Sequence, residues 1–496
     1  MTAYQFTALI LLVAVALPGC ARNPVSGRRE IVLTSTAAER ERGASAAEEV
    51  EEQVGLVEDA ELITYVRAVG ARLARHSPRR DVDYRFHVVD MIEPNAFALP
   101  AGYIYVSRGL LALLNSEDEL ANVLAHEIGH VAARHHAQSE VRRAPFLPLR
   151  VVAGLGAGVA SIISPLAGRV IAGLGQMPGT LLLAAHSRSQ ERQADEIGQR
   201  LAAAAGWDPL ALAHFMQTLS RDEALRGDDP TRKSFLSSHP TSPERSETTA
   251  ARARELDRAN TAPISADREQ FVRRLDGLLV GLSGSQGSFA GQRFLHADLD
   301  FTLEFPAEWA THNDAQVVAA REPKGSGFAL LRMVATGDDP MEAARGLSSY
   351  SSTRLDSAPK ATRVGDLRAA RATGSGGGLL NPASADLTWI AHGGNIYLVM
   401  GIGDADRFAA LRPTLRAVAQ SFRPLAAVER AGIRENRLRI LQATAGQTVA
   451  EFVAQNRGPW TAEEAAVANA LTLDETLPAG SLLKLPLPHP YTPASE

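Results

Sequence analysis

The chain is poor in cysteine and has no strong excess of charge of either sign. Among 496 residues there is one cysteine, Cys20, which excludes an intramolecular disulfide. The 51 Lys and Arg residues nearly balance 56 Asp and Glu residues, for a formal net charge of -5, and no block of like charges occurs. This balance argues against a nucleic-acid or polyanion partner. The length predicts about two to four domains, and a hydrophobic content of 45% is that of a globular protein.

The first 20 residues also lack Lys and Arg. Residues 8–17 are apolar but too short to span a bilayer as a stable helix, and the segment LPGC, ending at Cys20, follows them. The pattern resembles a bacterial lipoprotein signal peptide over residues 1–20. That resemblance implies that Cys20 is acylated and, with Ala21 next, that the protein is anchored at the outer membrane. The alternative is a plain signal peptide or an uncleaved anchor that carries a chance cysteine.

His126-Glu127-x-x-His130 lies in a run of residues with apolar positions at helical spacing, 117–134. Ser116 stands where it can cap this helix, and acidic residues follow in its first turn. Histidines four residues apart lie on one face of a helix, so both imidazoles can bind one metal ion while Glu127 stands beside the metal's water. This is the arrangement of a zinc metallopeptidase, with one Zn²⁺ per chain and Glu127 as the catalytic base.

A third ligand is predicted on a second helix that continues to Gly206. Glu191 and Asp195 are four residues apart there, and Glu191 can complete a His-His-Glu site whose fourth position is open to water. Asp195 is placed to accept the free N–H of a zinc-bound histidine and so to fix its tautomer. His135 and His136 lie off the face of the two ligand histidines, and we interpret them as a basic helix C-terminus.

Four stretches in this order resemble the BepA and HtpX family of zinc metallopeptidases, relatives of the CAAX prenyl protease. They are NAFALPAGYIYVSRGLL at 95–111, HEIGH at 126–130, SRSQERQAD at 187–195 and SSHPTSPER at 237–245. The resemblance covers roughly residues 22–254. It implies a mainly helical gluzincin domain with a small β-sheet, closer to the periplasmic BepA-like branch, which cleaves misfolded or stalled envelope polypeptides.

The resemblance also implies roles for residues outside the metal helix. His239 would occupy the open zinc position and hold the enzyme latent, whereas the sequence by itself favours a histidine in a surface loop. Arg245 would either brace the site or stabilise an oxyanion. Gluzincins place a strand edge beside the metal, where an extended substrate can pair with it. The candidate edge is Asn95, Ala96, Phe97 and Ala98, and an interior hairpin without a substrate role is the alternative.

The peptidase domain is expected over residues 21–265, and it contains an apolar, glycine-rich insertion at 145–185. This insertion is either a membrane-touching segment that shields the cleft or a helical hairpin buried in the core. Residues 266–290 are charged and then rich in Gly and Ser, which predicts a linker.

Two further domains are predicted after the linker. Residues 291–425 alternate strand and helix patterns, typical of an α+β sandwich broken by a loop at 374–378, and their opening resembles PsbP-like or Mog-type domains. Residues 430–488 predict the order β-α-α-β and resemble a LysM module, which either binds peptidoglycan or serves only for packing.

The predicted fold class is therefore multidomain α+β: a mainly helical peptidase domain with a small sheet, an α+β sandwich and a β-α-α-β module. The predicted function is that of a periplasmic, lipid-anchored zinc endopeptidase in protein quality control. Its expected partners are polypeptide substrates, the membrane through Cys20, and peptidoglycan. The alternative is a proteolytically latent, non-catalytic assembly factor or chaperone-like lipoprotein.

Overall fold

The structure is a computed structural model of the whole chain. It describes residues 19–22, 25, 27, 29–32, 35–138, 186–227, 235–240, 242–313, 317–350, 354–378 and 381–492. The expected signal segment up to residue 18 and the insertion at 145–185 lie outside these ranges. Cys20 lies in β1 (Gly19–Arg22), which pairs with β2 (Arg29–Val32). Over the described ranges, no helix combines the length and the apolar character that crossing a membrane requires.

The chain divides into two compact units, and both mix helices with sheets. Of the residues that the structure describes, the first unit includes those between 19 and 138, between 186 and 280 and between 437 and 487, and the second includes those between 281 and 436 and between 488 and 492. The predicted α+β class is confirmed at this level.

The first unit is built around a three-stranded sheet of order β3-β5-β4. β3 (Arg85–Val89) runs parallel to β5 (Tyr103–Ser107), and β4 (Ala96–Ala98) pairs antiparallel with β5, at the edge of the described sheet. The helices of this unit are α2 (Thr36–Gln53), α3 (Ala60–Ala74), α4 (Arg108–Leu113), α5 (Glu117–Ala132), α9 (Arg188–Ala204), α10 (Ala211–Arg226), α11 (Phe235–Ser238), α12 (Pro243–Ala253) and α13 (Arg268–Arg273).

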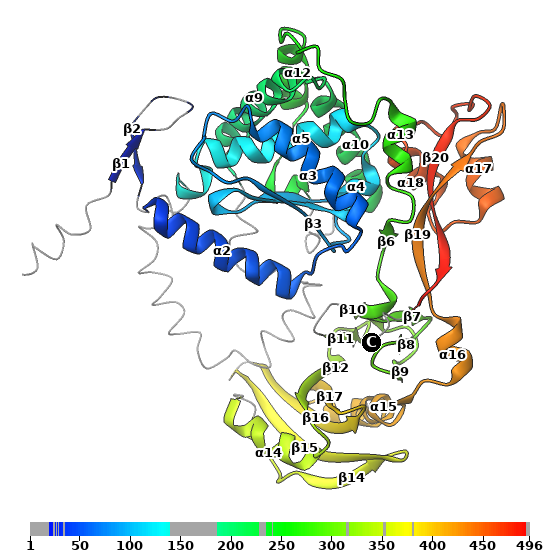
Figure 1. Cartoon of the computed structure of the whole chain (residues 1–496). Coiled ribbons are helices and arrows are strands. Elements are labelled where there is room, and N and C mark those ends of the chain that lie inside the picture. Colours follow the sequence, from blue (N-terminus) through cyan, green and yellow to red (C-terminus); the bar gives the residue numbers. More distant parts are fainter. Residues whose placement is uncertain are drawn as a thin grey trace, which may run out of the picture. The chain divides into compact units, whose positions relative to one another are not determined.

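The two faces of this sheet enter different apolar cores, because successive side chains of a strand point to opposite faces. Val88 and Ile104 pack with α3 and α5, whereas Val89, Phe97 and Tyr105 pack with α2. Figure 1 accordingly places α2 on one side of the sheet and α3 and α5 on the other. The metal helix α5 is therefore fixed between the sheet and the other helices.

The segment 266–290 is not a linker. It contains α13 and β6 (Leu279–Val280), and its apolar side chains, including Phe271 and Val272, are buried in the main core of the first unit. Apart from Gly277, its Gly and Ser residues lie in the later part, from Gly281 to Ser288, around η3 (Gly284–Gln286). The prediction failed because composition alone cannot reveal the core into which a short apolar stretch packs.

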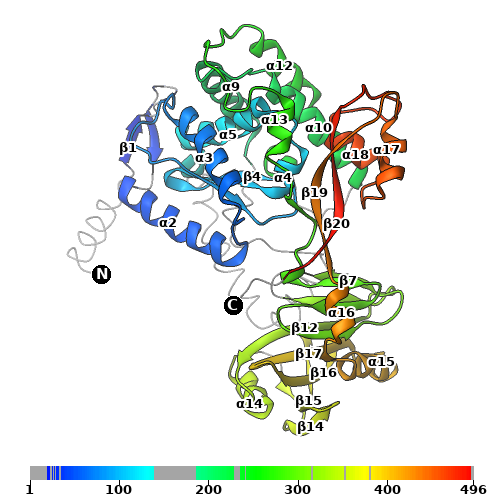
Figure 2. The same ribbon diagram turned by 45° about the vertical axis from the view of Figure 1, so that its right-hand side comes forward.

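The C-terminal module has the expected order of β19 (Arg434–Gln442), α17 (Val449–Asn456), α18 (Ala462–Ala468) and β20 (Leu482–Pro490), visible in Figure 2. Its strands join β6 in the sheet β20-β19-β6. The buried ammonium of Lys484 donates hydrogen bonds to the carbonyls of Ala112 and Leu114, 2.8 and 2.5 Å away, just before the metal helix begins. The module is thus packed into the peptidase unit. Its resemblance to LysM stays a prediction.

The second unit contains an eight-stranded sheet of order β10-β11-β12-β17-β16-β15-β13, with β14 also paired to β15, and a four-stranded sheet of order β18-β9-β8-β7. The bounds are β7 (Ser288–Ala290), β8 (Arg293–His296), β9 (Phe301–Glu304), β10 (Ala310–Asn313), β11 (Val318–Arg321), β12 (Gly327–Thr336), β13 (Arg354–Leu355), β14 (Lys360–Val364), β15 (Leu367–Gly378), β16 (Asn381–His392), β17 (Asn395–Asp404) and β18 (Arg423–Pro424). Helices α14 (Pro340–Tyr350) and α15 (Phe408–Gln420) pack on opposite faces of the larger sheet.

The loop expected at 374–378 is instead the end of β15. Gly374 pairs with Ala385 of β16, and Gly376 pairs with Ala383. Glycine weakens a strand, but a ladder of hydrogen bonds to a neighbouring strand outweighs that local preference.

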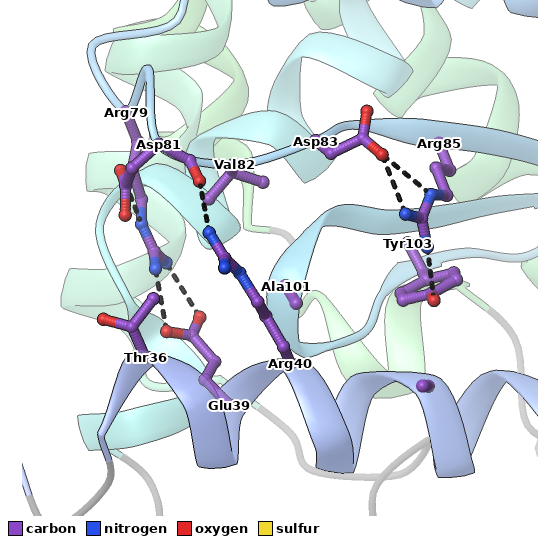
Figure 3. A pocket seen from close by; sticks show the side chains of 11 residues that line it. Thr36, Glu39, Arg40, Arg79, Asp81, Val82, Asp83, Arg85, Ala101 and Tyr103 are labelled. Carbon is purple, nitrogen blue, oxygen red and sulfur yellow. Dashed lines mark hydrogen bonds and ion pairs between the residues drawn. The ribbon is translucent and has the colours of Figure 1, made fainter.

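A pocket of about 400 Å³ lies between α2 and the turn that joins β4 to β5 (Figure 3). On its wall, the Arg79 guanidinium donates two hydrogen bonds to the Glu39 carboxylate, at 2.9 and 2.7 Å, and a third to the carbonyl of Val131, at 3.2 Å. Val131 directly follows His130 in α5. This ion pair therefore fastens α2 to the end of the metal helix.

Replacing Glu39 by Gln should lower the free energy of unfolding by roughly 2–3 kcal/mol, because it leaves the buried Arg79 with only the half-exposed Asp81, 3.5 Å away, as a counter-charge. Burial alone would raise the pKa of Glu39, but the hydrogen bonds and charge of Arg79 outweigh it, and the pKa is lowered. A lowered pKa contributes stability that is present above the unfolded value and is lost as pH falls through the folded one. Denaturant unfolding should therefore separate variant from wild type at neutral pH and bring them together in acid. Glu41→Gln, an exposed change on the same helix, is the control, and equal losses in both variants would contradict the assignment.

Candidate metal centre

The metal helix forms where the sequence predicts it. Ser116 caps α5 by accepting the N–H of Glu119 at 3.1 Å, and the helix runs to Ala132. His126, Glu127 and His130 are all buried.

Two glycines let α5 and α9 approach at backbone distance. A Cβ atom on Gly129 would lie 2.9 Å from the carbonyl oxygen of Ala194, and one on Gly198 would lie 2.9 Å from the backbone nitrogen of His126. Neither distance is compatible with a side chain, so this crossing requires glycine at both positions. The close approach brings Glu191 and Asp195 of α9 against the two histidines.

Four donor groups converge at this crossing: His126, His130, Glu191 and His239. His126 Nε2 lies 3.0 Å from His130 Nε2. The Glu191 carboxylate contacts both rings: its Oε2 lies 3.5 Å from His126 Nε2, and its Oε1 lies 3.4 Å from His130 Nε2. His239 Nδ1 lies 3.2 Å from His126 Nε2 and 3.2 Å from each Glu191 oxygen.

This donor set fits a zinc ion. Ligands at about 2.0–2.1 Å from a tetrahedral metal are about 3.3–3.4 Å from one another, close to the separations found here. The electrostatics agree: burial alone would lower the pKa of His126, but hydrogen bonds and charges from Asp195 and Glu191 raise it to about 10. The carboxylates of Asp195 and Glu191 thus favour positive charge at His126.

Asp195 and Arg245 hold this arrangement from behind. Asp195 Oδ1 lies 3.0 Å from His126 Nδ1, which leaves His126 Nε2 directed at the metal position. Arg245 binds both oxygens of Asp195, at 2.7 and 2.8 Å, and its Nη1 lies 3.0 Å from Glu191. Of the two roles open to Arg245 from the sequence, its contacts are those of a brace.

Glu127 lies beside the donor set with its carboxylate enclosed. It is 1% exposed, and among the described residues its Oε1 has no hydrogen-bond partner. Burial raises the pKa of Glu127 above its usual 4.5, and the charges of His239 and His126 offset this only in part. A buried carboxylate with a raised pKa is suited to accept and return a proton.

His239 is buried, although the sequence alone favoured a surface loop. It follows α11, its ring stacks on Phe235 with centroids 4.4 Å apart, and its Nε2 lies 3.6 Å from Glu127 Oε1. The N–H of Phe235 donates to the carbonyl of Pro94, next to the predicted substrate edge of Asn95 to Ala98. The α11 segment therefore lies beside both the donors and the start of β4.

The interpretation of His135 was wrong, because it is fully buried against His130. Their Nδ1 atoms are 2.8 Å apart, and His135 Nε2 lies 3.0 Å from the side-chain oxygen of Gln193. The argument from helical faces failed because α5 ends at Ala132 and Arg134 has a φ of 55°, which turns the chain back beneath the helix. The contact of His135 with Nδ1 of His130 leaves Nε2 of His130 directed at the metal position, as the contact of Asp195 leaves Nε2 of His126. His186 was also missed: its ring stacks on His130 with centroids 3.9 Å apart.

Known proteins are similar to this chain over the segment that contains the metal centre. A model of peptidase family M48 matches residues 61–253, which include both helices of the site, His239 and Arg245. Residues 61–253 are therefore a domain of peptidase family M48. The beta-barrel assembly-enhancing protease of Escherichia coli is 29% identical over 268 residues, 54% of this chain and 51% of its own. A mitochondrial metalloendopeptidase of Schizosaccharomyces pombe is 33% identical over 229 residues, 45% of this chain and 63% of its own.

The M48 match is confined to residues 61–253, and the chain spans about half the length of the Escherichia coli relative. Among solved structures, cyanobacterial PsbP from Synechocystis is similar to 28% of this chain and 95% of its own, with 13% identity and a TM-score of 0.22. At that score the similarity carries no conclusion, and the predicted PsbP-like character of residues 291–425 stays untested.

Proposed function

We propose that this protein is a zinc-dependent endopeptidase of the bacterial cell envelope. The observation that carries the proposal is the convergence of His126, His130, Glu191 and His239 on one point beside the buried Glu127. The name of the Escherichia coli relative, a beta-barrel assembly-enhancing protease, supports a role in quality control of envelope proteins. Misfolded or stalled polypeptides are the proposed substrates.

Each residue has a definite task in this proposal. His126, His130 and Glu191 hold the zinc ion, which when bound supplies Lewis-acid polarisation of a water molecule and of the scissile carbonyl. Glu127 accepts the proton of that water and later delivers it to the leaving amine. Asp195, braced by Arg245, keeps His126 in the tautomer that binds metal. The edge strand β4, from Ala96 to Ala98, pairs with the extended substrate.

His239 makes the enzyme latent in this proposal. Its Nδ1 stands 3.2 Å from both His126 Nε2 and the Glu191 carboxylate, where the fourth ligand of a tetrahedral metal would lie. Substrate can react only after the α11 segment moves His239 away. A non-catalytic assembly factor is the second candidate, and the same closed arrangement of His239 favours it.

Casein cleavage by wild type and by His239→Ala distinguishes these candidates. We expect the variant to gain activity by at least about tenfold, because the fourth position becomes free for water and substrate. A zinc chelator should abolish the gain. His214→Ala, an exposed histidine of α10, is the control and should stay at the wild-type level. If wild type and His239→Ala both contain zinc and both fail to cleave, the assembly factor is favoured.

Localisation and the accessory parts complete the proposal. We infer a periplasmic protein anchored at the outer membrane through acylated Cys20, on the pattern of its first 20 residues. We also infer that the C-terminal module either binds peptidoglycan or only packs. Its burial against the start of α5, through Lys484, supports the packing role.

A further inference from the structure

An unusual group of charges lies in the second unit, on the face of the large sheet that α15 covers. The carboxylate of Asp386, in β16, is 4% exposed and is surrounded by three arginines: Arg371 of β15, and Arg412 and Arg416 of α15. We call these four residues the arginine cluster. Arg412 Nε and Arg416 Nε both donate to Asp386 Oδ2, at 3.0 and 2.9 Å, and Arg371 Nε lies 3.4 Å from Oδ1.

The packing of α15 on the large sheet brings the side chains of the arginine cluster together. Asp386 pairs in register with Gly401 of β17, and a Cβ atom on Gly401 would lie 2.6 Å from Cβ of Leu415. The absence of a side chain at Gly401 lets α15 lie directly on the sheet. As a result, Arg412 and Arg416, one helical turn apart, reach Asp386 across that strand.

The arginine cluster has more positive charge than Asp386 neutralises, and more N–H groups than the described residues accept hydrogen bonds from. Three guanidinium groups and one carboxylate sum to a formal charge of about +2. All three arginines contact Asp386 through Nε, and in the described residues their Nη groups make no hydrogen bond. One of these atoms, Arg371 Nη2, is buried. The side chains of Arg412 and Arg416 are 37% and 39% exposed, and that of Arg371 is 23% exposed, so the cluster is open to solvent mainly on the side of α15.

We propose that the arginine cluster is a binding site for a phosphate monoester or inorganic phosphate. A phosphate dianion carries a charge of about -1.5 to -2 and three oxygens that accept hydrogen bonds from guanidinium groups, which matches the surplus of this site. Asp386 orients the three guanidiniums, and the dianion binds their Nη groups. The phosphate is either free or carried by a lipid headgroup, since both present the same oxygens.

The test uses the full-length protein and does not depend on peptidase activity. Inorganic phosphate is titrated by calorimetry at constant ionic strength into wild type, Arg412→Gln/Arg416→Gln and Arg368→Gln. Arg368 is the matched control, because it lies in the same strand as Arg371 but is 59% exposed and pairs with Asp338. We expect saturable binding by wild type and by the control, and an increase of at least about tenfold in Kd for the double variant. Equal Kd values for the double variant and the control, or no saturable binding by wild type, would overturn the proposal.

Two further measurements check the folding of the variants and identify the source of the phosphate. Arg371→Gln, a single change, should also weaken phosphate binding about tenfold, so the result does not depend on the folding of the double variant. Flotation with phosphatidylcholine vesicles, with and without phosphatidic acid, identifies the source. Binding that needs both phosphatidic acid and the arginines indicates a lipid headgroup, and binding of inorganic phosphate alone indicates a free anion.

Discussion

Replacement of Glu127 by Gln is expected to reduce peptide-bond hydrolysis by about 10²- to 10⁴-fold, the usual contribution of a general base, while zinc stays bound. Glu127 is not among the four converging donors, so its loss leaves the metal position unchanged. Glutamine has nearly the same shape but cannot take a proton.

The measurement is casein hydrolysis in the His239→Ala background, so that latency does not hide the effect, together with zinc content per chain. Glu196→Gln, a half-exposed change on α9 that pairs with Arg200, serves as the control and should leave both quantities unchanged. Full activity in Glu127→Gln would remove Glu127 from the mechanism. Loss of zinc in the same variant would assign it a ligand role instead.

Replacement of Glu191 by Gln is expected to have the second large effect, a fall in zinc affinity of more than about 100-fold. The change removes a charged ligand, whereas loss of an outer hydrogen-bond partner typically costs about 10- to 100-fold. Burial would raise the pKa of Glu191, but the charges of His239 and His126 and hydrogen bonds from both outweigh it, so the pKa is lowered and the carboxylate is ionised. Competition with a chromophoric zinc chelator measures the affinity directly.

The same titration ranks the residues behind the ligands. Asp195→Asn and His135→Ala should each lower zinc affinity by about 10- to 100-fold, less than Glu191→Gln, because each only orients a ligand histidine. Asp195 does so for His126 at 3.0 Å, and His135 does so for His130 at 2.8 Å. If His135→Ala has no effect, the contact between the two rings is only packing. If Asp195→Asn matches Glu191→Gln, the two carboxylates have the wrong roles in this assignment.

The parts of the site that the sequence predicted are those set by short-range geometry. A helix places His126 and His130 on one face whatever surrounds it, and the same is true of Glu191 and Asp195. The cap at Ser116 and the order of elements in the C-terminal module follow equally from neighbouring residues. The pairing of the two helices could be inferred only from the chemistry of a complete metal site.

His135 and Arg245 illustrate what such reasoning misses. His135 reaches His130 only because the chain reverses at Arg134, and no periodic pattern predicts where a helix stops within two residues. Arg245 binds Asp195 from 50 residues away. The burial of His239 likewise depends on where α11 packs.

The sequence by itself therefore determined which donor side chains share one face of α5 and of α9, and the mixed α+β class of the chain, because local periodicity and donor spacing are properties of the chain. Tertiary structure decided the rest. It packed residues 266–280 into the core, extended β15 through Gly374 to Gly378, buried Lys484 beside the metal helix and gathered three arginines around Asp386. These outcomes depend on contacts between residues far apart in the chain, whose free energy exceeds local preference and leaves no periodic trace in the sequence.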